Sequence, residues 1–149
     1  MRTRKASRLL IINPASQVLL FRFVHTDDAL AGSAYWATPG GGVEQNESFA
    51  HAALRELREE TGIIRDVIGE SVAERTFEML LPSGENVLAI EQFYWVKVDG
   101  SDISREGWSR HEKAVMHQHR WWNVNELSET TETVYPTDIA KIIENVIQR

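Results

Sequence analysis

The apolar positions predict β-strands in the first part of the chain. Apolar residues dominate positions 7–13 and 18–24, and a Pro-Ala-Ser turn joins the two runs, which is the pattern of a β-hairpin. Residues 35–38 are a short third strand candidate that runs into Pro39. The three glycines at positions 40–42 then indicate a turn.

A helical period replaces the strand pattern after residue 48. Phe49, Ala53 and Leu57 recur at i, i+4 and i+8, so residues 49–61 are predicted to form an amphipathic helix. Ser48 suits the N-cap of this helix. Gly62 suits the position just beyond its C-terminus, where a left-handed backbone favours glycine.

Strand patterns return in the second half of the chain. They occupy residues 64–81, 87–98 and 120–124, with a turn at 82–84 that makes the first two an antiparallel pair. Residues 99–113 are predicted to form a polar loop or a short helix.

A second amphipathic helix is predicted near the C-terminus. Pro136 suits its N1 position, and its apolar stripe is Ile139, Ile142, Ile143, Val146 and Ile147. Strands that precede, separate and follow two helices indicate an α/β layered domain.

The composition fits one globular domain over residues 1–149, with 42% hydrophobic and 26% charged residues. No apolar run approaches the ~18 residues of a membrane span. Cysteine is absent, which excludes disulfides, thiolate catalysis and cysteine-based zinc sites. We therefore expect a cytoplasmic protein without a membrane partner, either a monomer or a homodimer.

The net charge of −6 disfavours binding to polymeric nucleic acid, which needs a basic surface. It leaves open a phosphorylated small molecule, provided that metal ions supply the local positive charge.

Three carboxylates on the first predicted helix suggest such a metal site. Glu56, Glu59 and Glu60 are spaced i, i+3 and i+4, so they share an arc of about 100° on the helix surface. A solvated acidic face is the ordinary explanation of such a pattern. Here, however, the arc borders the apolar stripe instead of opposing it, and a hard divalent cation would offset the mutual repulsion.

The same segment resembles the Nudix box, G-x5-E-x7-R-E-U-x-E-E-x-G-U, where U is aliphatic. Every defined position is filled, by Gly41, Glu47, Arg55, Glu56, Leu57, Glu59, Glu60, Gly62 and Ile63. The resemblance implies the Nudix fold, a mixed β-sheet sandwiched between α-helices.

The resemblance also implies a function. It points to Mg²⁺-dependent hydrolysis, with Mn²⁺ as a possible substitute, of a phosphoanhydride bond in a nucleoside diphosphate linked to another moiety. The implied metal ligands are the Gly40 carbonyl, Glu56, Glu59 and Glu60. Arg55 is expected to orient these carboxylates and Glu47 by charge-assisted hydrogen bonds.

The general base has three candidates. Glu112 lies in the polar segment before the strand at 120–124, Glu91 lies within the strand at 87–98, and Glu56 lies in the box itself. Glu112 is the preferred candidate outside the box, although a solvated loop acid is an equal reading of that residue.

Substrate-binding candidates are one cation and several aromatic residues. Arg22 could meet a substrate phosphate, and Tyr35, Trp36 and Trp108 could stack on a base. Aromatic residues in strands are more often part of the core. Trp108, in a Gly-Trp-Ser loop, is expected to be the exposed one.

Two alternative functions remain. One is a house-cleaning pyrophosphatase that acts on damaged nucleoside triphosphates. The other is a nucleotide-binding module of the same fold without catalytic activity, although the complete box argues against it. No residue pattern names the substrate.

Overall fold

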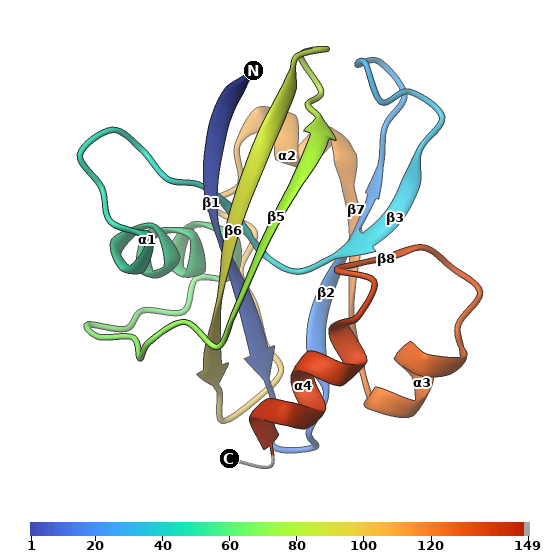
Figure 1. Ribbon diagram of the computed structural model, residues 1–149. Helices are drawn as coiled ribbons and strands as arrows, with labels where there is room; N and C mark the ends of the chain where they lie inside the picture. Colours follow the sequence, from blue (N-terminus) through green and yellow to red (C-terminus); the bar gives the residue numbers. More distant parts are fainter. Residues whose placement is uncertain (148–149) are drawn as a thin grey trace.

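The computed structural model describes residues 1–147 as one curled, mixed β-sheet with helices on both faces (Figure 1). The strands are β1 (Arg2–Ile12), β2 (Val18–Val24), β3 (Ala34–Ala37), β4 (Gly40–Gly42), β5 (Ala73–Leu80), β6 (Asn86–Lys97), β7 (Met116–Trp122) and β8 (Val134–Tyr135). The helices are α1 (Phe49–Thr61), α2 (Arg110–Val115), α3 (Val124–Glu129) and α4 (Ile139–Ile147).

Strand β1 organises the sheet, whose order is β5-β6-β1-β2-β3-β8. It pairs in parallel with β6 along its whole length, and β5 adds to β6 in the antiparallel sense that the sequence predicts. On its other edge β1 meets β2 only at Ile12 and Val18, next to the hairpin turn. Strand β4 pairs with the free part of that edge, from Ala6 opposite Gly42 to Arg8 opposite Gly40.

The glycine segment is therefore a strand, and the predicted turn at residues 40–42 is wrong. Glycine has weak strand propensity, so the local sequence gives no strand signal. The pairing comes from β1, more than thirty residues earlier in the chain. The result is a strand without side chains between the diverging β1 and β2.

Side chains that alternate along β1 build two cores, one on each face of the sheet. Leu9 and Ile11 pack under α1 and α2, whereas Leu10 and Ile12 pack under α3 and α4. Figure 1 shows α1 and α4 on opposite sides of the sheet. The predicted mixed sheet between helices is confirmed.

Helix α1 has the predicted bounds and caps. The Ser48 hydroxyl accepts a hydrogen bond from the backbone N–H of His51 at 3.0 Å. Gly62 ends the helix with a left-handed backbone, φ 78°, and donates its N–H to the Arg58 carbonyl. Because caps and period are local features, the sequence was sufficient to locate this helix.

Shorter elements differ from the sequence expectations. Residues 64–72 lack regular strand structure, so the strand-rich segment begins only at β5. Asn123 caps the unpredicted helix α3, by accepting a hydrogen bond from the backbone N–H of Glu126. Pro136 precedes α4 by three residues and is not at its N1 position.

Among residues 1–147, none of the helices combines the length and the hydrophobicity that crossing a membrane requires.

Candidate active site

Two acidic side chains of α1 are buried against the glycine strand. Glu56 and Glu60 are 8% and 2% exposed, and the Glu60 Oε1 accepts a hydrogen bond from the Gly40 backbone N–H at 2.9 Å. A Cβ atom at Gly41 would lie 2.5 Å from the Glu56 Oε1. Only glycine therefore lets β4 approach the helix this closely.

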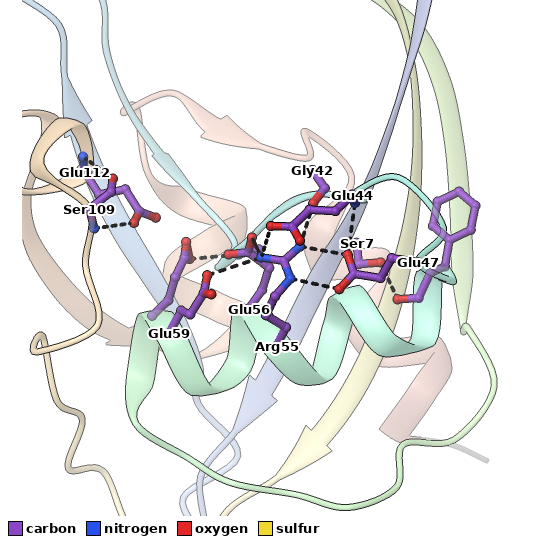
Figure 2. Close-up of polar contacts among 12 residues, drawn as sticks. Ser7, Gly42, Glu44, Glu47, Arg55, Glu56, Glu59, Ser109 and Glu112 are labelled. Carbon is purple, nitrogen blue, oxygen red and sulfur yellow. Dashed lines mark hydrogen bonds and ion pairs between the residues drawn. The ribbon is translucent and has the colours of Figure 1, made fainter.

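Arg55 binds the acidic residues around the start and the middle of α1 (Figure 2). Its guanidinium donates two hydrogen bonds to Glu47, at 2.9 Å each, one to Glu56 at 2.8 Å and one to Glu59 at 3.2 Å. It also donates to the Gly42 carbonyl at 2.8 Å. The hydrogen bonds from Arg55 lower the pKa of Glu47 to about 2. These are the contacts expected from the sequence.

The loop before α2 is fixed to the C-terminal end of α1. The Trp108 Nε1 donates a hydrogen bond to the Glu60 carbonyl at 2.8 Å, and the indole is only 6% exposed. A Cβ atom at Gly107 would lie 2.5 Å from the Glu59 carbonyl oxygen. The expectation that Trp108 is exposed is therefore wrong, because the indole forms part of the core under α1. Its contact with α1 determines where α2 begins.

Helix α2 brings a third carboxylate to the two buried ones. Glu112 sits at the N3 position of α2, and its Oε1 accepts a hydrogen bond from the Ser109 backbone N–H at 2.8 Å. Ligand atoms of Glu56, Glu60 and Glu112 all lie within 4.8 Å of one another. Figure 2 shows Glu112 extending from α2 toward the carboxylates of α1.

This cluster needs a counter-charge. Burial raises the pKa of Glu60 well above its usual range, and the hydrogen bond with Glu112 raises it further. Burial also raises the pKa of Glu56, against the hydrogen bond from Arg55. An all-oxygen set of converging carboxylates fits a hard divalent cation such as Mg²⁺ or Mn²⁺. Glu59 is outside this compact group and 38% of its side chain is exposed.

The cluster lines a cavity of about 420 Å³, here called the metal cavity. Its walls are α1 and α2 with their carboxylates, the glycines of β4, and β1 with Arg4 and Arg8. A second cavity of about 630 Å³, here called the sheet cavity, shares Arg8 and Tyr35 with it. The sheet cavity extends between β3 and β5 and holds the aromatic rings of Phe77 and Tyr135.

Glu91 lies apart from the carboxylate cluster. It is 5% exposed and accepts a hydrogen bond from the Arg8 Nε at 2.9 Å, in a salt bridge that lines the sheet cavity. The negative charge of Glu91 is therefore already balanced by Arg8. Of the three base candidates, the structure brings only Glu112 and Glu56 together.

Tyr35 is the one predicted stacking residue that lines both cavities. Its ring stacks on Phe23 and His25, with centroids at 5.4 and 5.6 Å, and its hydroxyl is 2.9 Å from the His25 Nε2. The Nδ1 of His25 is in turn 2.8 Å from the Asp28 carboxylate. The phenol is therefore held in place at the junction of the cavities.

The prediction that Trp36 stacks on a base is wrong because of strand register, and the same register places Arg22 outside the two cavities. Trp36 is 4% exposed and packs edge-on against Trp122 in the core under α3 and α4. Arg22 pairs with Trp36 across β2 and β3, so it shares that face, and it lines neither cavity. Tyr35, one residue away from Trp36, faces the cavities instead.

Sequence reasoning missed Arg4 and Arg8. Arg4 fell outside the first predicted strand, which was placed at residues 7–13, whereas β1 begins at Arg2; Arg8 fell inside that strand but was given no role. The even positions 2, 4 and 8 place three arginines on one face of this strand. This spacing by even numbers of residues was the sequence signal that could have identified them as residues of one strand face.

Comparisons with known proteins agree with this architecture. A family model described as NUDIX domain matches residues 1–146. An RNA pyrophosphohydrolase from Novosphingobium aromaticivorans is 32% identical over 74 residues, which cover 48% of this chain and 44% of that protein. The matched region thus spans less than half of the length of that relative.

Solved structures match over nearly the whole chain. The MutT protein from Methanosarcina mazei Go1 has a TM-score of 0.67 at 24% identity, covering 99% of this chain and 94% of that one. The MutT NUDIX hydrolase from Burkholderia pseudomallei has a TM-score of 0.64 at 18% identity, covering 98% and 99%. At these identities the likeness shows the fold.

Proposed function

The chain belongs to the NUDIX domain family, and from this membership we propose that it is a metal-dependent hydrolase of a phosphoanhydride bond. The proposed substrate is a nucleoside diphosphate linked to another moiety. One observation carries the proposal: Glu56, Glu60 and Glu112 converge within 4.8 Å in a cavity that also contains arginine side chains. Such a cavity offers both a cation site and groups that bind phosphate.

Mg²⁺ is the proposed ion, with Mn²⁺ as a substitute. Glu56 and Glu60 would hold it, Glu59 and the Gly40 carbonyl remain proposed additional ligands, and Glu112 is kept for a separate role. When bound, the ion supplies charge neutralisation for the phosphate oxygens and a lowered pKa for a coordinated water.

Glu112 is the proposed general base. In hydrolysis a water oxygen forms a bond to phosphorus, the bond from phosphorus to the bridging oxygen breaks, and the departing phosphate keeps the electron pair. The proton of the water goes to a carboxylate, for which Glu112 is better suited than Glu56. The reason is that Glu56 accepts a charge-assisted hydrogen bond from the Arg55 guanidinium, whereas Glu112 accepts its hydrogen bond from a neutral backbone N–H, that of Ser109.

The nucleoside is proposed to occupy the sheet cavity, with its diphosphate reaching into the metal cavity past Tyr35. The rings of Tyr35, Phe77 and Tyr135 line the sheet cavity, and stacking on a base contributes about 1–3 kcal/mol. A small molecule fits a chain of net charge −6 better than polymeric nucleic acid does.

The test is a panel of nucleoside diphosphate derivatives, nucleoside triphosphates and 5′-triphosphorylated RNA, assayed by chromatography for release of a nucleoside monophosphate, phosphate or pyrophosphate with Mg²⁺, with Mn²⁺ and after exhaustive chelation. We expect chelation to abolish release and added Mg²⁺ to restore it. Glu60→Gln protein purified in parallel controls for contaminating phosphatases.

Each outcome separates the alternatives. Preference for triphosphates would favour the house-cleaning pyrophosphatase. Binding without hydrolysis would favour the inactive module. Strong inhibition of small-molecule turnover by single- or double-stranded nucleic acid at physiological salt would favour a polymeric substrate, and release that survives chelation would contradict metal dependence.

A further inference from the structure

Among the residues that the structure describes, Arg4 is the arginine of the β1 face without a hydrogen-bonded or ion-paired partner. Arg2 is paired with Glu85, through hydrogen bonds of 2.8 and 2.9 Å, and Arg8 is paired with Glu91 at 2.9 Å. Among residues 1–147, leaving aside the side chain of residue 117, no side chain or backbone oxygen accepts a hydrogen bond from the Arg4 guanidinium, and no carboxylate forms an ion pair with it. Arg4 nevertheless lines the metal cavity.

Its environment is costly for an unpaired charge. The side chain is half-buried, and burial lowers the pKa of Arg4, with the nearby charge of Arg8 adding to the effect. A guanidinium stays protonated in proteins, so the cost is met by an anion and not by loss of the proton. The charges of Glu91 and Glu56 also act on Arg4, but Glu91 forms its ion pair with Arg8 and Glu56 forms its ion pair with Arg55.

The glycine strand places Arg4 close to the carboxylate cluster. A Cβ atom at Gly42 would lie 3.3 Å from the Arg4 Nη2, whereas one at Gly41 would lie 2.5 Å from the Glu56 Oε1. Successive residues of a strand face opposite sides. Arg4 and Glu56 therefore approach β4 from its two sides, and no side chain of β4 separates them.

We propose that Arg4 is a substrate-positioning residue that binds non-bridging oxygens of the substrate's diphosphate, opposite the carboxylates of α1 and α2. This inference rests on the proposed function and deepens it. A guanidinium matches two phosphate oxygens at once, which fixes the orientation of the group as well as its position. Arg4 thus takes the phosphate-binding role that the sequence had suggested for Arg22.

The test measures binding instead of turnover. Isothermal titration calorimetry with magnesium pyrophosphate is performed on the wild type, Arg4→Gln and Arg2→Gln. Arg2 is the matched control because it lies on the same face of β1 but is exposed and paired with Glu85. We expect Arg4→Gln to weaken pyrophosphate binding about 10- to 100-fold, as for the loss of charge-assisted hydrogen bonds, and Arg2→Gln to leave it within twofold.

A second titration, with Mn²⁺ alone, distinguishes positioning from folding. Removal of a cation near the carboxylate cluster should leave Mn²⁺ affinity unchanged or increase it. For Arg4→Gln we therefore expect weaker binding of magnesium pyrophosphate together with unchanged or tighter binding of Mn²⁺. A parallel loss of both affinities would show a structural role and overturn the proposal.

Two further outcomes are decisive. Pyrophosphate affinity within twofold of wild type in Arg4→Gln, or no detectable binding by the wild type, would overturn the role of Arg4. A wild type that binds pyrophosphate through Arg4 but hydrolyses no member of the panel would overturn the proposed function alone. If Arg4→Gln does not fold, Arg4→Lys keeps the charge but not the two-pronged geometry, and a loss of about 3- to 10-fold is expected.

Discussion

The two walls of the metal cavity differ in how their charges are balanced. On the helix wall, Arg55 is surrounded by acceptors, with Glu47 and Glu56 among them. The carboxylates of Glu60 and Glu112 instead meet each other. The helix wall therefore has an excess of negative charge at one place, next to β4.

The strand wall has the reverse arrangement. Arg8 and Glu91 neutralise each other, whereas Arg4 lines the cavity and, among the residues described, forms no ion pair with a carboxylate. Each wall thus contains one charge network satisfied within the protein and one charge that is not. Charged groups that are paired within the protein should contribute to the free energy of unfolding, and charged groups without such a partner should contribute to binding of metal and substrate. Single substitutions can separate these two classes.

Glu60→Gln should give the largest effect on turnover. The amide can still accept the hydrogen bond from Gly40, but it removes the charge that would hold a cation, so we expect turnover to fall by roughly 10³-fold or more. Without metal, stability should be unchanged or higher, because a like-charge contact is relieved. Steady-state kinetics and thermal melts with chelator measure both.

Glu59→Gln is the matched control on the same helix. Glu59 lies outside the compact group, so Glu59→Gln should lower turnover less than Glu60→Gln does. If Glu60→Gln kept turnover within about threefold of wild type, or if it melted well below wild type, the distinction between the two classes would fail on this wall.

Glu112→Gln and Glu91→Gln compare one unsatisfied and one satisfied carboxylate. A general base contributes about 10²–10⁴-fold, and we expect a loss of this size for Glu112→Gln with little loss of stability. For Glu91→Gln we expect near-normal turnover but a lower free energy of unfolding, by about 1–3 kcal/mol, because Arg8 loses its counter-charge.

Equal and small kinetic effects of these two substitutions would move the base to Glu56. A large kinetic effect at Glu91, with stability unchanged, would contradict the assignment of Glu91 to the structural class.

The sequence was sufficient for the parts of the site that depend on local chemistry. The period, N-cap and C-terminal glycine of α1 are all encoded within residues 48–62, and the hydrogen bond from Arg55 to Glu59 follows from their i, i+4 spacing. Glu112 was found only as a candidate, because its approach to α1 depends on contacts of Trp108 and Gly107 with the helix backbone.

The strand wall was beyond local reasoning. Which face Arg22, Trp36 and Tyr35 occupy is decided by the pairing of β2 with β3, and a register change of one residue exchanges the two faces. The strand character of β4 comes wholly from its pairing with β1. The free charge of Arg4 appears only after the partners of Arg2 and Arg8 are known.

Arg55→Gln should lower stability more than it lowers turnover per folded molecule. The Arg55 side chain is 17% exposed and makes several charge-assisted hydrogen bonds, so we expect a loss of about 2–3 kcal/mol in the free energy of unfolding. Turnover should fall about tenfold, because Glu56 loses an orienting partner. Urea unfolding with chelator present, and kinetics at saturating Mg²⁺, measure the two effects.

Arg58→Gln is the control, because Arg58 is exposed on the same helix and should change stability by no more than about 0.5 kcal/mol. Equal stability losses at both positions would show that the hydrogen bonds of Arg55 stabilise the fold no more than an exposed arginine does.

Glu47→Gln should give the smallest effect, and it should depend on pH. The pKa of Glu47 is lowered from 4.5 to about 2, chiefly by the hydrogen bonds from Arg55, so the folded state favours the ionised carboxylate. The stability that this provides is complete above about pH 4.5 and is lost as the pH falls toward 2. The wild type should therefore exceed Glu47→Gln in free energy of unfolding at pH 6, and the difference should shrink at pH 4 and again at pH 3. Urea midpoints at the three values measure it. The difference should also shrink at every pH in an Arg55→Gln background, because the main partner that lowers the pKa of Glu47 is gone and the backbone N–H of Glu44 remains. A difference that stays constant from pH 6 to pH 3, or that persists undiminished without Arg55, would mean that Glu47 contributes to stability through its shape and not through its charge.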